Sequence, residues 1–169
     1  MSRHSVEKFN TVCGNPPKTV DNTKEEIWKQ LSNQSNILKE EMNELLDACD
    51  AEDIVEVLDA VVDMYFVLDY FPTIFKSLGI DFAGASYAVD ENNATKFSRS
   101  LELITKSAKA HNDNGNPCYT EGVKYGGDYY YVVKRVSDNK VQKPVDFVPV
   151  DLKPCIPEDV MLKLSSHLM

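Results

Sequence analysis

Hydrophobic residues recur at helical spacing through the N-terminal part of the chain. One such stretch covers about Lys24–Cys49, and a second covers about Asp53–Tyr70, where Pro72 ends or kinks it. Only the short polar break Asp50–Asp53 separates the two stretches. A connection this short predicts two long antiparallel helices that lie side by side.

Shorter elements surround this pair. The pattern predicts helices at Val6–Val12, through much of 73–98 with an interruption at Leu78–Asp81, at 99–110 and at Pro157–Leu168, and strands at Asp128–Val136 and Lys140–Lys143. We therefore expect a mainly α fold, an antiparallel helix bundle of about four to five helices with a small C-terminal β-hairpin appendage. Residues 1–111 would form the helical core, and residues 112–169 the hairpin and a C-terminal extension packed on that core.

Three acidic residues stand out on the second long helix. Between Val55 and Leu68 the formally charged residues are Glu56, Asp59 and Asp63, and at about 100° per residue they fall within roughly 60° of one another. The rest of the circumference is apolar, so we expect this helix to be buried nearly all round. Desolvating ionised carboxylates is costly, and no Lys or Arg lies on this helix to compensate them. A hard divalent cation would compensate them, and a salt-bridged polar seam is the alternative.

The first long helix adds Glu40, Glu41 and Glu44. On a helical wheel Glu41 lies nearest the apolar arc and shares a face with Glu44, whereas Glu40 points away from that arc. Glu41 and Glu44 are therefore the better candidates for inward ligands, and Glu40 for an outer, supporting role. A run of Glu on one helix is also typical of a solvated face, so this helix alone does not establish a site.

The overall charge narrows the choice of partners. The chain has 18 basic and 27 acidic residues, a formal net charge of −9. Phosphate backbones reward clustered Lys and Arg, so an acidic chain argues against a nucleic-acid partner. An anionic substrate that arrives paired with a divalent cation is compatible with this charge. No stretch approaches the roughly 18 apolar residues of a membrane span, so no membrane partner is expected.

The four cysteines bear on the compartment. They form no CxxC pair and fit no zinc-binding spacing; they are Cys13, Cys49, Cys118 and Cys155. The first residues contain no apolar run typical of a secretory signal. Free thiols in a reducing cytosol are the simplest interpretation, so we expect a cytoplasmic protein, or one in the host cytoplasm if the chain is viral.

The acidic residues also form a spaced pattern, ExxE at Glu41–Glu44 and ExxD at Glu56–Asp59. This pattern resembles that of the all-α nucleoside triphosphate pyrophosphohydrolases, the MazG-type superfamily. The flanks are similar to its phosphoribosyl-ATP pyrophosphohydrolase-like branch, which is common in phage-encoded proteins. The similar segments span most of the chain and are Phe9–Pro16, Ile37–Leu45, Leu58–Asp63, Leu78–Asp81, Val89–Phe97, Ser137–Pro144 and Val148–Leu152.

This resemblance implies hydrolysis of ribo- or deoxyribonucleoside triphosphates between the α and β phosphates, which yields monophosphate and pyrophosphate and controls nucleotide pools. Mg²⁺, or alternatively Mn²⁺, would be held by Glu41, Glu44, Glu56 and Asp59, with Asp63 as a further ligand or a supporting acid. Glu40 or Glu41 would orient the water that attacks the α-phosphorus. Related enzymes assemble from two or more chains, which implies a homodimer or a homotetramer.

Contacts to the substrate are implied outside the acidic pairs. Asn93 and Lys96 share a helix face, where Lys96 suits a phosphate and Asn93 suits a base edge or a sugar. Gln34 is a further candidate for substrate binding, at a position where the branch often has Arg. Asp90 stands where a His is frequent in the branch.

Other functions share the same residues. Phosphoribosyl-ATP hydrolysis in histidine synthesis uses the same site chemistry. A non-catalytic protein that sequesters nucleotides is an alternative of a different class. A structural helical dimer, whose acids bind Ca²⁺ or Mg²⁺ for stability only, is another, and the metal-binding residues alone do not separate these functions.

Overall fold

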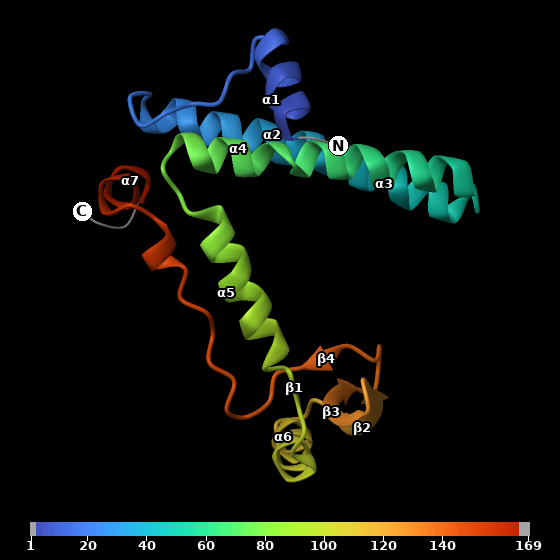
Figure 1. The fold of residues 1–169 in the computed structure, drawn as a ribbon. Coiled ribbons are helices and arrows are strands. Elements are labelled where there is room, and N and C mark those ends of the chain that lie inside the picture. Colours follow the sequence, from blue (N-terminus) through green and yellow to red (C-terminus); the bar gives the residue numbers. More distant parts are fainter. Residues whose placement is uncertain (1–2, 166–169) are drawn as a thin grey trace. The chain divides into compact units, whose positions relative to one another are not determined.

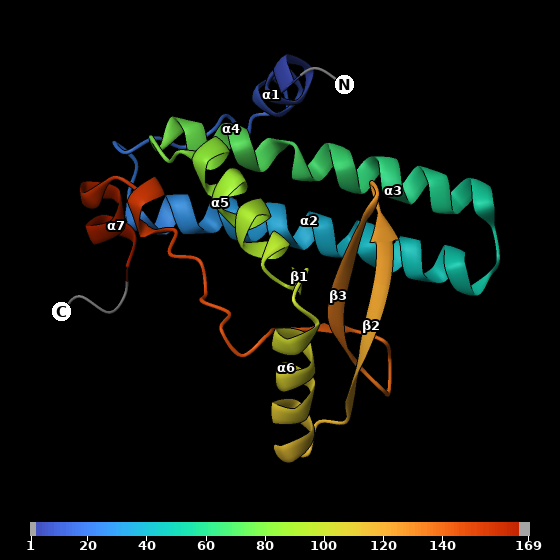
Figure 2. The ribbon, with the colours of Figure 1, turned by 60° about the horizontal axis from the view of Figure 1, so that its bottom comes forward.

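The computed structural model describes residues 3–165, which fall into two compact units (Figures 1 and 2). Unit 1 is assigned to Met1–Phe82 together with Lys153–Met169, and unit 2 to Ala83–Leu152. Unit 1 is therefore built from two separate stretches of the chain, and unit 2 is inserted between them.

Two long helices dominate unit 1. Helix α2 spans Lys24–Asp50 and helix α3 spans Ile54–Leu68, and Figures 1 and 2 show them side by side. Thr23 begins α2 with a capping box, because its hydroxyl accepts from the Glu26 amide while the Glu26 carboxylate accepts from the Thr23 amide. Asp53 begins α3 by accepting from the amides of Val55 and Glu56. The predicted pair of long helices is thus present, and the Asp53 cap lies at the predicted break between them.

The other helices of unit 1 are short. Helix α1 spans Arg3–Val12, α4 spans Tyr70–Ser77, and a 3-10 turn at Lys153–Cys155 leads into α7 at Glu158–Leu164. Pro72 lies in the first turn of α4, where its missing amide proton costs no intrahelical hydrogen bond. The chain therefore changes from α3 to α4 just before Pro72, as its position predicts.

The core of unit 1 draws on both stretches of the chain. Its buried cluster consists of Val6, Ile27, Tyr70, Ile74, Leu78 and Val160. Val160 is on α7, which follows unit 2 in the sequence. The C-terminal helix thus completes a core that the N-terminal helices begin.

Unit 2 combines two helices with a small antiparallel sheet. Its elements are α5 (Phe82–Ala94, which begins at the last residue of unit 1), β1 (Phe97–Ser98), α6 (Leu101–Asp113), β2 (Cys118–Tyr125), β3 (Asp128–Arg135) and β4 (Val141–Gln142). The strands follow the order β1-β3-β2, and β4 also pairs with β3. Helix α6 packs on the sheet through a core of Ile104, Ala108, Cys118 and Val133.

The fold class is mainly α with a small antiparallel sheet, as expected, although the helices outnumber the four to five predicted. The principal hairpin differs from the prediction. Strand β3 pairs along its whole length with β2, through a turn at Gly126 and Gly127, whereas the pairing with residues near 141 covers only two positions. The structure forms two units, divided after Phe82 and before Lys153. The predicted division into residues 1–111 and 112–169 stays a prediction.

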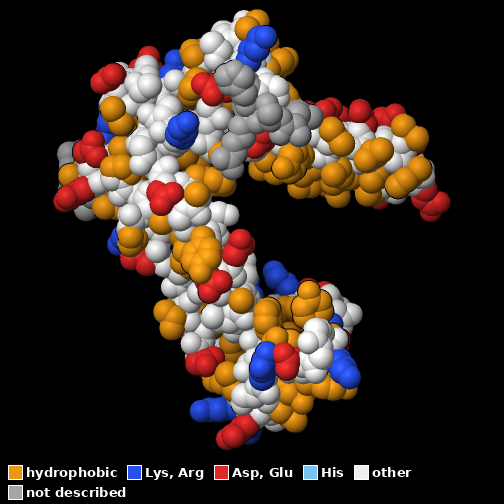
Figure 3. All heavy atoms as spheres, in the orientation of Figure 1, with side chains coloured by type: hydrophobic (Ala, Val, Ile, Leu, Met, Phe, Trp, Pro, Cys, Tyr) orange, Lys and Arg blue, Asp and Glu red, His pale blue; other side chains and the backbone are white. Residues whose placement is uncertain are grey.

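Helix α3 is not buried nearly all round. Within the chain it buries only Ala60 and Val67, and its large apolar side chains are largely exposed (Figure 3). Five of the exposed ones form a stripe at helical spacing: Ile54, Leu58, Val61, Tyr65 and Leu68. The prediction was wrong because an apolar pattern shows only that a helix surface needs to be covered. The packing within this chain leaves most of that surface of α3 exposed.

No helix within residues 3–165 is both long enough and apolar enough to cross a membrane.

Candidate active site

The predicted metal ligands lie on the antiparallel pair α2 and α3. Glu40, Glu41 and Glu44 follow one another along α2, and Glu56, Asp59 and Asp63 along α3. Because the helices run in opposite directions, Glu41 lies toward Asp63 and Glu44 toward Asp59. The two acidic segments are therefore brought together by the fold, as the short connection predicts.

Glu41 has the most distinctive surroundings of the six acids. It is half-buried, whereas the other five are exposed. Burial raises the pKa of the Glu41 carboxyl, and repulsion from Glu44, Asp63, Glu40 and Asp59 raises that pKa further. Acids from both helices thus repel the same carboxylate, that of Glu41. Glu41 is half-buried and Glu40 is exposed, as the helical wheel predicts.

The donor chemistry of these acids suits a divalent cation. Within the part of the chain that the structure describes, none of the six carboxylates accepts a hydrogen bond or pairs with a Lys or Arg. Uncompensated carboxylate oxygens are the ligands that Mg²⁺ and Mn²⁺ prefer. However, no three His, Cys, Asp or Glu side chains among residues 3–165 are arranged as a metal-binding group. The donor types fit the ion, and its binding would require these side chains to turn toward one another.

The exposure of the acids on α3 removes the argument from burial, which was the reason in the sequence for expecting a metal. Glu56, Asp59 and Asp63 are exposed in the chain by itself, so burial does not force them to be compensated. The physical reason that remains for expecting a metal is the repulsion among the carboxylates, which contributes to the raised pKa of Glu41. The assignment of the six acids as ligands and water-orienting groups stays a prediction.

A pocket of about 310 Å³ adjoins the acids, and Glu41 and Asp63 are among its lining residues. Gln34 also lines it and is almost fully buried, with its side-chain amide donating to the Val67 carbonyl at 2.9 Å. Gln34 was a candidate from the sequence, whereas the aromatic walls of this pocket, Phe9 and Phe66, were not. Phe9 falls in the similar segment Phe9–Pro16, which is the one signal for it in the sequence.

Asn93 and Lys96 belong to unit 2. The Lys96 ammonium donates to the Asn93 side-chain oxygen at 2.7 Å, at the end of α5. The two side chains therefore contact each other, but Lys96 lies in the turn after α5, so they do not share a helix face as predicted. Their roles in substrate binding stay predictions, because they lie in a different unit from the acids.

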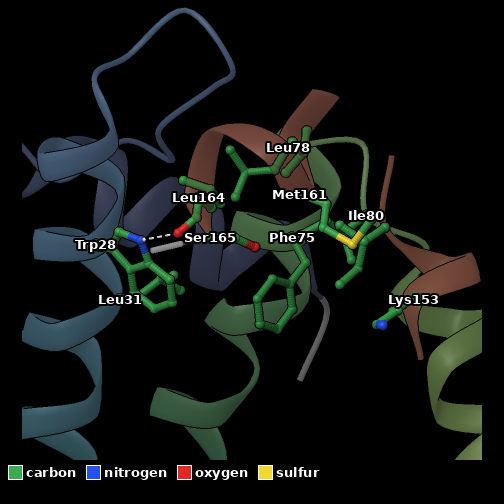
Figure 4. Close-up of a pocket in the computed structure, with 11 residues that line it drawn as sticks. Trp28, Leu31, Phe75, Leu78, Ile80, Lys153, Met161, Leu164 and Ser165 are labelled. Carbon is green, nitrogen blue, oxygen red and sulfur yellow. Dashed lines mark hydrogen bonds between the residues drawn. The ribbon is translucent and has the colours of Figure 1, made fainter. Parts of the chain in front are cut away.

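A larger cavity in unit 1, of about 700 Å³, has a different character (Figure 4). Trp28, Phe75 and Met161 contribute to a lining that is mainly apolar and includes none of the six acids. The Trp28 indole donates to the Leu164 carbonyl at 3.1 Å, which ties α2 to the end of α7. Trp28 thus has a packing role here, and Lys153 is the one Lys or Arg among the residues that line the cavity.

Comparison with known proteins identifies the stretch that carries the acids. Residues 14–93 match the family described as phosphoribosyl-ATP pyrophosphohydrolase, a range that contains α2, α3 and α4. The resemblance found from the ExxE and ExxD pairs is thereby confirmed. The matching family is, by its description, one of pyrophosphohydrolases.

A viral protein is also similar to the chain. An uncharacterised protein of Acanthamoeba polyphaga mimivirus is 30% identical over 101 residues, which is 59% of this chain. The match covers 40% of that relative, so this chain spans less than half of its length. No solved structure matches the chain.

Proposed function

We propose that the chain hydrolyses nucleoside triphosphates between the α and β phosphates, releasing a nucleoside monophosphate and pyrophosphate. One observation carries the proposal: uncompensated acids from two antiparallel helices meet beside a pocket, within the stretch that matches the pyrophosphohydrolase family. Phosphoryl transfer demands positioning and charge neutralisation more than covalent chemistry, and a cluster of acids around a divalent cation is suited to both.

The proposed ligands are Glu41, Glu44, Glu56 and Asp59, with Asp63 beside them. Bound among these carboxylates, Mg²⁺ would neutralise charge on the phosphate oxygens and on the departing pyrophosphate. Glu41, or its neighbour Glu40, orients a water in line with the α-phosphorus and accepts its proton. The water oxygen then bonds to the α-phosphorus as the bond to the β-phosphate bridging oxygen breaks.

A second candidate substrate is phosphoribosyl-ATP. The matching family bears that name, and the substrate presents the same triphosphate to the same acids. Neither the acids nor the pocket distinguishes the two substrates, because both proposals use the chemistry of the phosphates.

The test is an assay of the purified chain with Mg²⁺ and a panel of ribo- and deoxyribonucleoside triphosphates and phosphoribosyl-ATP. We expect stoichiometric pyrophosphate and monophosphate, with activity lost in EDTA and restored by Mg²⁺ or Mn²⁺. Release of single phosphate would contradict cleavage between the α and β phosphates. Tight nucleotide binding without turnover would favour a sequestering protein instead.

A further inference from the structure

The pocket beside the acids is elongated along α2. Gln34 and Glu41 both line it, and seven residues of helix separate them by about 10 Å. Asp63 faces the Glu41 end, and Val67, one turn along α3, faces the Gln34 end. One end of the pocket is therefore acidic and the other end is not.

The end away from the acids has an aromatic wall. Phe9 of α1 meets Phe66 of α3 edge to face, with ring centroids 5.4 Å apart. Phe9 is 55% exposed, so much of its ring surface is not covered by the chain. A partly exposed ring in a pocket is suited to stack against a flat aromatic group.

Gln34 supplies the polar group at this end. A carbonyl oxygen accepts but never donates, so the bond to the Val67 carbonyl identifies the donating atom as Gln34 Nε2. Gln34 Oε1 receives no hydrogen bond from residues 3–165. Yet no side-chain nitrogen or oxygen in that part of the chain is sealed from solvent without a partner. Gln34 is only 4% exposed and lines the pocket, so its Oε1 is open through the pocket.

We propose that this end of the pocket is the base subsite of the nucleotide, stacked against Phe9, with an N–H on the edge of the base donating to Gln34 Oε1. The proposal rests on the proposed function, since it places the phosphates at the Glu41 end. It deepens that function by naming what selects the substrate. A base that presents an N–H toward Gln34 is accepted, and a base that presents only an acceptor there leaves two hydrogen-bond acceptors facing each other.

The test compares two pocket variants with matched controls on the same helices. Phe9→Ala removes the stacking wall. Gln34→Met keeps the length of the side chain but removes its acceptor, together with the donor to the Val67 carbonyl. Val12→Ala on α1 and Ser35→Ala on α2 are the controls, because neither side chain lines this pocket. For each, KM and kcat are measured over the triphosphate panel, and the binding of nucleoside monophosphates is measured by calorimetry.

Phe9→Ala should raise KM and the monophosphate Kd about tenfold, as expected when an aromatic stacking partner is lost. Gln34→Met should reduce the preference between the best and the worst base by about tenfold. In both variants kcat should stay near the wild-type value, and the controls should change neither constant.

The outcomes separate this proposal from the proposed function. Weakened monophosphate binding in Phe9→Ala, in a chain that hydrolyses nothing, would support the subsite while the hydrolase proposal fails. Unchanged KM, Kd and base preference in a chain that does hydrolyse triphosphates would overturn the subsite alone. If Gln34→Met fails to fold by circular dichroism, Phe9→Ala decides, because a residue more than half exposed tolerates truncation.

Discussion

Tyr70 ties the segment before α2 to the helical core of unit 1. Its side chain is fully buried, and its hydroxyl donates to the Asn15 carbonyl at 2.5 Å. Burial raises the pKa of this hydroxyl from its ordinary value of 10.0 to about 12, with a smaller contribution from Glu7. The folded state thus keeps the hydroxyl protonated at a pH where the unfolded chain would lose the proton.

Tyr70→Phe should therefore lower the free energy of unfolding by about 1 kcal/mol at neutral pH, because the Asn15 carbonyl loses its donor. The folded pKa is above the unfolded one, so the ionisation contribution is fully present below about pH 10 and is lost as the pH rises toward 12. The variant should lose stability less steeply across that window. Denaturant unfolding from pH 7 to 11.5 measures both effects, with Tyr87→Phe, at an exposed position outside the α3 stripe, as control. Identical curves for wild type and Tyr70→Phe would contradict this role.

The acids of α2 and α3 give a second prediction at the scale of single residues. Asp59→Asn and Glu41→Gln should each lower kcat/KM by roughly 100-fold or more while leaving the helices intact, because each removes a carboxylate assigned to the divalent cation that binds the phosphates. Asp47→Asn is the matched control, since Asp47 is an exposed acid on α2 outside the proposed ligand set. Pyrophosphate release and circular dichroism are the measurements. Wild-type turnover in either variant would remove that residue from the site.

The turn between α2 and α3 shows how a single element is held. Two backbone bonds end α2, from the Glu52 amide to Cys49 and from the Asp53 amide to Ala48. Glu52 adopts φ 55, a left-handed conformation in which a Cβ is strained and glycine is favoured. The end of α2 thus has the backbone geometry that usually requires glycine, but the residue at that position is Glu52.

Glu52→Gly should accordingly raise the free energy of unfolding by about 0.5 kcal/mol, the strain relieved less the entropy that glycine loses on folding. Glu52→Ala removes the same charge but keeps the Cβ, so it should show no such gain. Thermal and denaturant unfolding of the two variants compare them directly. Equal stability of the glycine and alanine variants would show that charge, not backbone conformation, governs this turn.

The elements differ in how far the sequence predicts them. Helices α2 and α3 follow from apolar periodicity and from the caps at Thr23 and Asp53, because those signals are local. Strand β2 escaped prediction because its residues, Cys118–Tyr125, do not alternate clearly, although Gly126 and Gly127 are a hairpin signal. The meeting of the acids was predictable from the short connection, whereas the pocket walls on α1 depend on tertiary packing that no local pattern encodes.

At the scale of the molecule, the exposed apolar stripe of α3 calls for a partner. Monomeric proteins rarely expose large contiguous apolar patches, and this stripe runs along most of α3, beside exposed Met42 and Leu46 of α2. We expect a homodimer or homotetramer in which a second copy covers it. The sequence indicated that the apolar surface of α3 must be buried. It could not indicate where, because burial against a partner and burial in the chain's own core produce the same hydrophobic pattern.

The double variant Leu58→Glu/Val61→Glu should accordingly convert the assembly to monomers, because it places charges in the middle of the stripe. Light scattering after size-exclusion chromatography measures the mass. Val136→Glu, at a 58% exposed position in unit 2, is the control and should leave the mass unchanged. A wild-type chain that is monomeric at micromolar concentrations would contradict the expectation.

Charge is also distributed unevenly over the molecule. Within 83–152 the basic and acidic residues balance, so the net charge of −9 falls on the residues assigned to unit 1. The acidic excess therefore belongs to the unit that holds the proposed site. This placement is consistent with a substrate whose phosphates arrive with their own divalent cation.

The interrupted connectivity of unit 1 has a consequence for the order in which the protein is made. A ribosome releases residues 83–152 before α7, so the inserted unit has all of its sequence while the core around Tyr70 still lacks Val160. During that interval the cavity of Figure 4 has no wall on its α7 side. The core of the acidic unit is therefore complete only once α7 has been made, and a nascent chain stalled before Glu158 would contain the whole sequence of unit 2 but not that of unit 1.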